Sequence, residues 1–360
     1  MQVKTYNTVI IGGGVIGNSI AYHLSKKGEK EIAVMERDFP LSGTSGATQA
    51  WVWVHSKEPV SYALFNKQSS DLYPNLQKEI GDFEYMQQGG IVPIFEEDAL
   101  ADAVCLAEEQ QQAGIPVQVL TREEVLEIEP EISSEVVGAT YSPIDGSVHP
   151  FRLVERYMNA ARKNDVHYYF YNKVIKAKRQ KDGYLLTTNK GKELFAKHVV
   201  IASGTWSKEV GELFEVHIPV KPVRGQVLIT EQMQPLFKHV IMGMRQLKNG
   251  EVLSDFTEQE AGFDKRSTFD KMEETAKRAV KIIPALKDAM IIRSFSGLRA
   301  IPEDDFPILG EVKGKANLYV ACMHSGMTLS PLIGNIISDL ILYKKTAIDY
   351  SRYHVNRFLG

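Results

Sequence analysis

The chain has 360 residues, with 42 lysines and arginines against 45 aspartates and glutamates and a formal net charge of −3. A hydrophobic share of 44% and a charged share of 24% are ordinary for a globular protein, and the length fits one large or two smaller domains. The balanced charge gives no reason to expect nucleic acid as a partner. The two cysteines, Cys105 and Cys322, exclude a disulfide framework and a cysteine-built metal centre. We expect both to be small buried residues in a reducing compartment.

No segment predicts a membrane span. The longest apolar stretch, Leu329 to Tyr343, is interrupted by Asn335 and Asp339. It falls short of the roughly 18–20 apolar residues that a spanning helix needs. No small-residue cleavage site follows the apolar N-terminal segment, so a signal peptide is not indicated. We therefore expect no transmembrane segment and a cytoplasmic location.

Residues 8–36 are typical of a strand, a glycine turn, a helix and a second strand. The β-branched run 8–11 and the apolar run 32–35 predict buried strands. Apolar residues at helical spacing over 18–27 predict a helix that Gly28 ends. The turn between the first strand and this helix reads Gly12-Gly13-Gly14-Val15-Ile16-Gly17.

This arrangement predicts a dinucleotide-binding turn. Gly12 permits the tight turn, Gly14 lets the backbone approach a pyrophosphate, and Gly17 lets helix and strand pack closely. The helix start attracts phosphates. Glu36, at the end of the second strand, can accept hydrogen bonds from a ribose diol. The alternative is a coincidental glycine turn, and the pattern alone does not choose between NAD and FAD.

The rest of the chain predicts further elements in order. Thr121 and Glu124 form a capping box for a short helix, and Pro150 suits the first turn of a helix over 151–163. Strands are predicted over 168–176, 184–189 and 197–201. Asn249-Gly250 predicts a hairpin between 242–246 and 251–256, Ser267 opens an amphipathic helix that ends near Pro284, and another helix runs from about Thr328 to Leu342.

Segments along the whole chain resemble the FAD-dependent D-amino-acid-oxidase-like (DAO) family, which includes glycine oxidase, sarcosine oxidase and the flavin subunits of opine and hydroxyproline dehydrogenases. The hydroxyl-rich loop 42–50 is similar to the family's second flavin-contacting loop. The other similar segments are 202–207 (Ala-Ser-Gly-Thr-Trp-Ser), 222–226 (Pro-Val-Arg-Gly-Gln), 297–310, which begins Gly-Leu-Arg, and 324–331 (His-Ser-Gly-Met-Thr-Leu-Ser-Pro).

The resemblance implies an α/β fold of the glutathione-reductase-like type. A Rossmann-type FAD-binding domain would comprise residues 1–82, 145–222 and 299–360. An antiparallel-sheet α+β substrate domain, interleaved with it, would comprise residues 83–144 and 223–298.

The resemblance also implies which residues contact FAD. The amides at the start of the helix near Thr328 would face the pyrimidine edge of the flavin, where a positive helix end favours negative charge. The backbone at Val174 would meet the adenine end. The full set is Gly12, Gly14, Val15, Ile16, Gly17, Glu36, Arg37, Thr44, Ser45, Thr48, Gln49, Val174, Ser203, Gly204, Trp206, Arg299, Ser325, Gly326, Met327 and Thr328.

Two residues are candidates for a catalytic role. Arg299 lies at the family's position for gripping a substrate carboxylate, which a guanidinium does with two parallel hydrogen bonds. The alternative is a structural ion pair at the domain interface. His324 would contact the flavin or orient the substrate amine, or it would only cap the turn before the helix. No catalytic base is evident, and desolvation would favour a neutral amine.

The substrate pocket is expected to include Trp51, Trp53, Gly243 and Arg299. The two tryptophans could instead pack on one face of a sheet. Gly243 stands where glycine oxidase has a tyrosine, so we expect more room and a substrate bulkier than glycine, such as a cyclic or N-substituted amino acid. Ser296 occupies the position of the flavin-linking cysteine of sarcosine oxidases, so FAD should be non-covalent.

The implied reaction is oxidation of the CH–NH bond of a small amino acid to an imine, by hydride transfer to FAD. The strand 251–256 lacks the lysine with which sarcosine oxidases activate oxygen, which favours a dehydrogenase. Both kinds of electron acceptor stay open: O2 for an oxidase, and a protein or a quinone for a dehydrogenase. One alternative is the flavin subunit of a multi-subunit dehydrogenase complex, and another is an NAD-linked dehydrogenase. A homo- or hetero-oligomer is compatible with the sequence.

Overall fold

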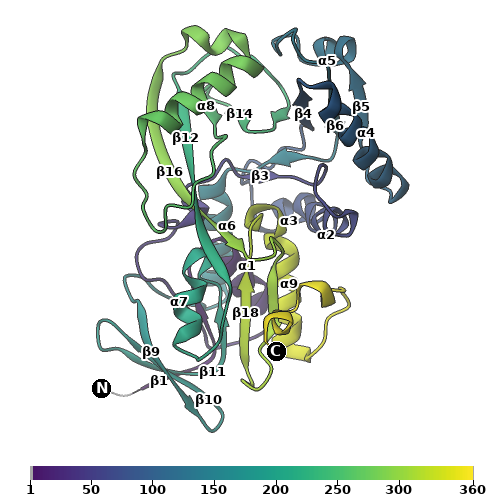
Figure 1. The fold of residues 1–360 in the computed structure, drawn as a ribbon. Coiled ribbons are helices and arrows are strands. Elements are labelled where there is room, and N and C mark those ends of the chain that lie inside the picture. Colours follow the sequence, from purple (N-terminus) through teal and green to yellow (C-terminus); the bar gives the residue numbers. More distant parts are fainter. Residues whose placement is uncertain (1–2, 360) are drawn as a thin grey trace.

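Two eight-stranded sheets organise the protein, whose computed structural model describes residues 3–359 (Figure 1). The first sheet has the order β17-β18-β11-β1-β2-β8, with β10 and β9 extending it from β11. Its four central pairings are parallel, as a dinucleotide-binding fold requires. Its strands are β1 (Lys4–Ile11), β2 (Ile32–Met35), β8 (His167–Tyr169), β9 (Val174–Gln180), β10 (Gly183–Thr188), β11 (Glu193–Ile201), β17 (Ile308–Glu311) and β18 (Leu318–Cys322).

Helices α1 (Val15–Lys26), α6 (Pro150–Lys163) and α9 (Gly326–Tyr343) share one hydrophobic core with this sheet. The contact between α1 and α9 is close, because a Cβ on Gly334 would lie 2.3 Å from Ser19 Oγ. Ser19 Oγ also donates to the Ser330 carbonyl at 2.6 Å. The other face of the sheet is covered by a second apolar cluster that includes Phe214 and Val355. The helix starts of α1 and α9 are thus held at the same sheet edge.

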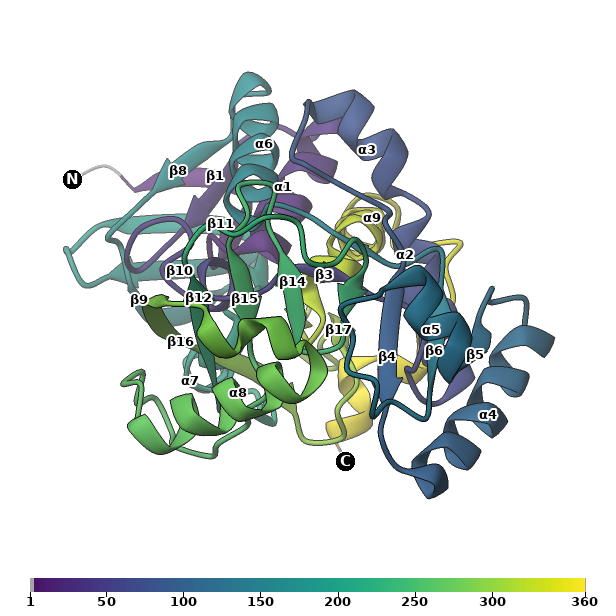
Figure 2. The ribbon, with the colours of Figure 1, turned by 90° about the horizontal axis from the view of Figure 1, so that it is seen from above.

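The second sheet has the order β16-β12-β15-β14-β13-β4-β6-β5 and is antiparallel except between β13 and β4. Figure 2 shows α8 (Phe269–Ile282) lying across this sheet, with α4 (Glu97–Gln112) beside its β5 end. The strands are β4 (Gly90–Ile94), β5 (Gln118–Thr121), β6 (Gly138–Ser142), β12 (Val220–Thr230), β13 (Val240–Ile241), β14 (Met244–Gln246), β15 (Val252–Ser254) and β16 (Ile291–Pro302).

The remaining elements connect these layers. A two-stranded ribbon of β3 (Trp51–Val52) and β7 (Gly146–Ser147) lies between the sheets (Figure 1). The other helices are α2 (Val60–Ser70), α3 (Tyr73–Ile80), α5 (Arg122–Ile128) and α7 (Ser207–Glu212). The predicted domain boundaries stay a prediction. The strands of the second sheet lie within residues 90–142 and 220–302.

Most predicted elements are confirmed. The capping box of Thr121 and Glu124 is present at α5, and the Asn249-Gly250 turn joins the antiparallel pair β14 and β15. The predicted strand over 168–176 is wrong, because it divides into β8, which pairs with β2, and β9, which pairs with β10. Between them Tyr171 has φ +56°, a left-handed conformation that ends one strand before the next begins.

The expectation for the cysteines is half right. Cys322 is buried, whereas Cys105 is exposed on α4, so the expected burial of Cys105 is wrong. Helix α4 covers one end of the second sheet with only two fully buried residues, which leaves most of its side chains in solvent.

Helix α9 is long and apolar enough to cross a membrane, although the sequence was expected to hold no such segment. Within the structure 72% of this helix is buried against the rest of the protein. That burial is what a core helix shows, and it accounts for the apolar composition.

Candidate functional site

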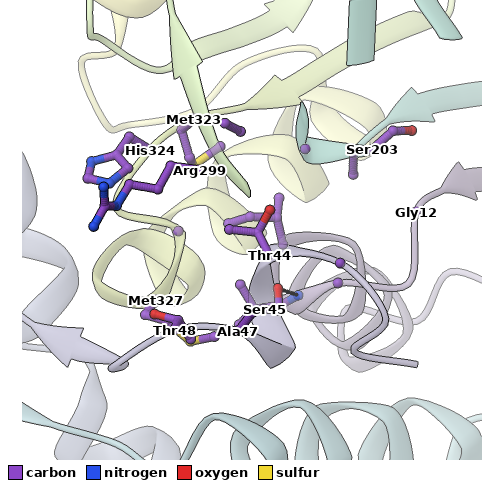
Figure 3. A pocket seen from close by; sticks show the side chains of 18 of the residues that line it. Gly12, Thr44, Ser45, Ala47, Thr48, Ser203, Arg299, Met323, His324 and Met327 are labelled. Atoms are coloured by element: carbon purple, nitrogen blue, oxygen red, sulfur yellow. Dashed lines mark hydrogen bonds between the residues drawn. The ribbon is translucent and has the colours of Figure 1, made fainter. Parts of the chain in front are cut away.

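A cavity of about 860 Å³ lies between the two sheets, and residues from both line it (Figure 3). Nearly all residues predicted to contact FAD or substrate line this cavity. The exception is Gly17, which lies behind it: a Cβ there would be 1.9 Å from the Gly12 carbonyl oxygen. The structure therefore brings together segments that are far apart in the sequence.

The glycine turn forms the dinucleotide end of the cavity. Gly12 has φ +122°, and a Cβ on it would lie 2.3 Å from the Ala202 carbonyl oxygen. Helix α1 begins directly after Gly14, which has no side chain, and the hydroxyl of Ser45 from the neighbouring loop reaches the first amide of the helix. The backbone at Gly14 is thus open to a pyrophosphate at a positive helix end. Side chains in place of these glycines would fill the turn, so the turn as it stands fits a dinucleotide.

Glu36 stands at the tip of β2 as the fingerprint requires. Its Oε2 accepts from the Gly13 amide at 2.8 Å and its Oε1 accepts from the Asp38 amide at 3.0 Å. These bonds fix the carboxylate beside the turn, where a ribose would lie. The Arg37 guanidinium stacks on the Trp206 ring at 3.6 Å from its centroid, so the two residues form one wall of this end.

The loop 42–50 is fixed against β16 and α9. Thr44 Oγ1 donates to the Leu298 carbonyl at 2.6 Å, and Ser45 Oγ accepts from the Val15 amide at 3.0 Å. A Cβ on Gly297 would lie 2.5 Å from the Ala47 carbonyl oxygen, so loop and strand are in direct contact. Thr328 Oγ1 accepts from the Trp53 amide at 3.0 Å, which ties this region to the start of α9.

Arg299 lies on β16 with its guanidinium in the cavity wall, beside His324 (Figure 3). Its Nη2 is 2.6 Å from Asp255 Oδ2, and its Nη1 donates to the Thr257 carbonyl at 2.8 Å. Glu258, which is largely exposed, adds a contact of 3.3 Å. Burial raises the pKa of Asp255, against the lowering effect of the Arg299 charge. Arg299 thus faces the cavity and is at the same time paired.

His324 precedes α9 and opens onto the same end of the cavity. Desolvation by the surrounding protein, with the charges of Lys57 and Arg299, lowers the pKa of His324. The ring is therefore neutral near pH 7, despite the part of its surface that is open to the cavity. The Nδ1 atom of His324 is 3.4 Å from Ser325 Oγ. His324 therefore acts in the cavity as a neutral hydrogen-bonding group and not as a charged one.

Trp51 and Trp53 both line the cavity, and Trp53 is packed against His55 behind it. His55 and Asp145 form a fully buried pair that supports this wall. The expected room at Gly243 is wrong. A Cβ there would lie 1.9 Å from the Phe256 ring, so Phe256 fills the space that a side chain would take.

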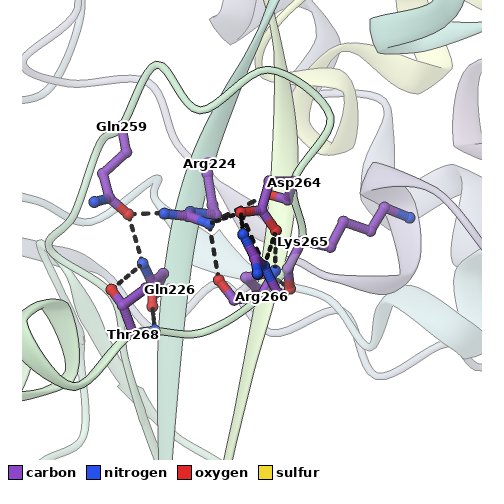
Figure 4. Close-up of polar contacts among 8 residues, drawn as sticks. Arg224, Gln226, Gln259, Asp264, Lys265, Arg266 and Thr268 are labelled. Carbon is purple, nitrogen blue, oxygen red and sulfur yellow. Dashed lines mark hydrogen bonds and ion pairs between the residues drawn. The ribbon is translucent and has the colours of Figure 1, made fainter.

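A polar network holds the loop 257–268 over β12 (Figure 4). Arg224, in the Pro-Val-Arg-Gly-Gln segment, is only 5% exposed. Its Nε donates to Gln259 Oε1 at 3.1 Å, its Nη1 donates to the Arg266 carbonyl at 2.9 Å, and Asp264 Oδ2 lies 3.2 Å away. From this loop Lys265 donates to the Ser42 carbonyl at 3.2 Å, so the network also ties the loop to loop 42–50, which lines the cavity.

Lys57 and Asp255 are among the charged residues that line the cavity and that the sequence motifs do not indicate. Neither belongs to a motif. Asp255 lies in the predicted strand 251–256, just after the end of β15, and Lys57 lies beyond the loop that ends at residue 50. Both are charged side chains near the end of a predicted element, loop 42–50 for Lys57 and the strand 251–256 for Asp255. That position is the one sequence feature that could have indicated them.

Comparisons with known proteins agree with this geometry. A family model described as FAD dependent oxidoreductase matches residues 7–340. Glycine oxidase of Geobacillus kaustophilus is 31% identical over 99% of this chain and 98% of its own length. An opine oxidase subunit of Rhizobium meliloti is 28% identical over 97% of this chain and 96% of its own. The crystal structure of the Geobacillus glycine oxidase superposes with a TM-score of 0.94 at 30% identity, covering 99% of this chain and 100% of that one.

Proposed function

The chain belongs to the family of FAD-dependent oxidoreductases, and from this premise we propose that it oxidises the CH–NH bond of a small amino acid, N-substituted and cyclic ones included, to an imine. When bound, FAD supplies the hydride acceptor for this step. The observation that carries the proposal is the position of Arg299 in the cavity wall, beside a neutral His324 and on the strand that contacts loop 42–50.

The chain's own residues would bind and orient the substrate. Arg299 would take the carboxylate of the amino acid in a bidentate contact, for which its guanidinium must share or leave the Asp255 contact. His324, which carries no charge near pH 7, would hydrogen-bond the amine. Trp51 and Trp53 would exclude water from the reacting carbon. Desolvation would favour the neutral amine, so a separate base is not required.

We propose that the cofactor is held without a covalent bond by the residues predicted for it. Neither cysteine lines the cavity, and Ser296, at the position of a possible attachment, donates to the Lys265 carbonyl instead. The phosphates would lie at Gly12, Gly14 and the start of α1. The free cysteines are in keeping with a reducing, cytoplasmic location, which is also part of the proposal.

A second candidate is the flavin-bearing component of a larger complex that passes electrons onward. It is supported by relatives that match over 96–97% of their own length and whose names mark them as subunits, the opine oxidase subunit of Rhizobium meliloti and the hydrogen cyanide synthase subunit HcnC of Pseudomonas protegens. A dehydrogenase would use a protein or quinone acceptor, whereas an oxidase would use O2.

An anaerobic flavin-reduction screen tests the proposal. Purified protein loaded with FAD is mixed with glycine, sarcosine, proline, hydroxyproline, D-amino acids and N-carboxyalkyl amino acids, and bleaching of the flavin band near 450 nm is followed. Bleaching by any of them supports amino-acid oxidation, and bleaching by none contradicts it. Air is then admitted: rapid reoxidation indicates an oxidase, and slow reoxidation indicates a dehydrogenase.

A further inference from the structure

The substrate end of the cavity holds three cations, Arg299, Arg278 and Lys57, with different surroundings. Arg299 lies 2.6 Å from Asp255 and 3.3 Å from Glu258, so carboxylates already balance its charge. Arg278, which also lines this end, is turned to Glu274 at 3.1 Å. Lys57 is different: among residues 3–359 no carboxylate oxygen lies within ion-pair distance of its Nζ.

Lys57 is placed by packing rather than by an opposite charge. It follows β3 on the segment that leads into α2, and its carbonyl accepts from Gln110 Nε2 at 3.0 Å. Its Nζ donates to Ser325 Oγ at 2.9 Å and lies 5.3 Å from the centroid of the Tyr62 ring. Burial lowers the pKa of Lys57 to about 8, with Asp145 acting in the opposite direction. Lys57 is therefore still mainly an ammonium group at pH 7. Burial removes part of the water that would otherwise solvate this charge.

Lys57 and Arg299 both lie near His324 in the cavity wall. The charges of both reach this ring, and Ser325, the hydrogen-bond partner of Lys57, is the next residue in the chain. The histidine itself is neutral, so the two cations are separate positive sites in one cavity. A single carboxylate held by Arg299 would leave the Lys57 charge without a counter-ion in a largely desolvated place.

We propose that Lys57 is a second anion site and that the substrate is an amino acid with two carboxylates, one held by Arg299 and the other by Lys57. The proposal rests on the proposed function for the identity of the reacting group. In this arrangement Asp255 stays beside Arg299 and orients the guanidinium that holds the first carboxylate. The second carboxylate can sit on the nitrogen substituent or on the side chain, since both present the same anion.

Binding of unreactive ligands tests the site without turnover. Diglycolate and methoxyacetate have the same ether backbone but two carboxylates and one carboxylate, respectively. The FAD-loaded protein is titrated with each, and the change in the flavin absorption spectrum gives the two dissociation constants. We expect diglycolate to bind about tenfold more tightly or better, as a charge-assisted contact in a desolvated site allows.

The Lys57→Met variant keeps the length of the side chain and removes the charge. We expect it to lose most of the preference for diglycolate, while methoxyacetate binds within about threefold of wild type. Lys57→Arg should keep the preference, which separates loss of charge from misfolding. Lys67→Met, on the outer side of α2 where Lys67 pairs with Asp71 at 2.8 Å, is the matched control and should behave as wild type.

Three outcomes overturn the proposal: equal binding of the two ligands by wild type, an unchanged preference in Lys57→Met, or an equal loss for both ligands, which would make Lys57 a flavin or first-carboxylate contact. Anaerobic reduction then distinguishes the sources, with iminodiacetate for the nitrogen-linked carboxylate and the D- and L-forms of aspartate and glutamate for the side-chain carboxylate. If no amino acid reduces the flavin but the preference depends on Lys57, the anion site stands and the proposed oxidation falls.

Discussion

Arg299 Nη2 lies 2.6 Å from Asp255 Oδ2 in the wall of the cavity, so the predicted carboxylate ligand and an acid share one site. Arg299 is thus both a cation that faces the cavity and a member of an ion pair, the two roles considered for it from the sequence. They are compatible, because a guanidinium has five N–H donors and can serve Asp255 and a substrate at once. A substrate carboxylate would then meet a cation already oriented by its partner.

Arg299→Lys tests whether this orientation matters. Lysine keeps the charge but cannot form two parallel hydrogen bonds, so we expect a loss of about 2–4 kcal/mol in transition-state stabilisation. This corresponds to a fall in kcat/KM of roughly 30- to 900-fold with the substrate found in the reduction screen. An unchanged kcat/KM would remove Arg299 from the substrate site and leave it as a structural ion pair.

Gly17→Ala should abolish cofactor binding. The new Cβ would lie 1.9 Å from the Gly12 carbonyl oxygen, so the turn must open and its amides move away from the phosphates. Gly13→Ala is the graded comparison, since the nearest contact of its new Cβ would be Glu36 Cβ at 3.1 Å rather than a carbonyl oxygen at 1.9 Å. We expect protein purified from Gly17→Ala to carry little or no FAD and Gly13→Ala to keep much more, as measured by the ratio of flavin to protein absorbance. Equal FAD content in the two variants would contradict this interpretation of the turn.

Sequence reasoning located the site through motifs whose geometry is local. The turn 12–17, the tip of β2 at Glu36 and the start of α9 each follow from short patterns of glycines and apolar residues, and the structure brings them to one cavity. It did not locate Lys57 or Asp255, because their importance comes from contacts with Ser325 and Arg299 that only the tertiary fold creates.

The misjudged room at Gly243 has the same origin. A missing side chain enlarges a cavity only if no neighbour fills the space, and here Phe256 fills it from the segment that follows β15. The division of residues 168–176 between β8 and β9 was also not readable, since both halves have strand-forming side chains.

The two cysteines should differ sharply toward thiol reagents. Cys322 is buried, desolvation raises its pKa to about 12, and its Sγ contacts the Gly204 carbonyl, whereas Cys105 is exposed on α4. Because the thiolate is the reactive form, we expect one thiol to react in the native protein and a second only after unfolding. Mass spectrometry after iodoacetamide treatment should find the native label on Cys105, and Cys105→Ser should remain unlabelled. Rapid native labelling of Cys322 would show that the wall behind the cavity opens.

Binding at the proposed second anion site should weaken in alkaline solution. Burial lowers the pKa of Lys57 from 10.5 to about 8. The side chain is therefore mostly protonated at pH values below about 8 and loses its positive charge at higher pH. Asp145 acts to keep the proton on Lys57, and His324 is neutral throughout this range. The preference for diglycolate over methoxyacetate should therefore be constant near pH 6–7 and fall up to tenfold per unit above about pH 8. In Lys57→Arg the preference should persist to higher pH, and an identical profile for the two proteins would assign the pH dependence to another group.

Arg224 should control how firmly the loop 257–268 is held against Trp206 and loop 42–50. Its guanidinium reaches Gln259, Asp264 and the Arg266 carbonyl together, and an ammonium at position 224 can replace only part of this set (Figure 4). We expect Arg224→Lys to loosen the loop and so to speed tryptic cleavage after Lys265 and Arg266. It should also weaken retention of FAD, because the Lys265 contact with the Ser42 carbonyl depends on the loop position.

Arg266→Lys is the control for this experiment, since the Arg266 side chain is 86% exposed and the substitution keeps a tryptic site at the same place. The measurements are the rate of cleavage in the loop and the rate of flavin release on dilution. If Arg224→Lys is cleaved no faster than Arg266→Lys, the loop is held by its contacts with Trp206 and loop 42–50 rather than by the buried guanidinium. If cleavage rises while flavin release is unchanged, the network stabilises the loop without closing the cavity.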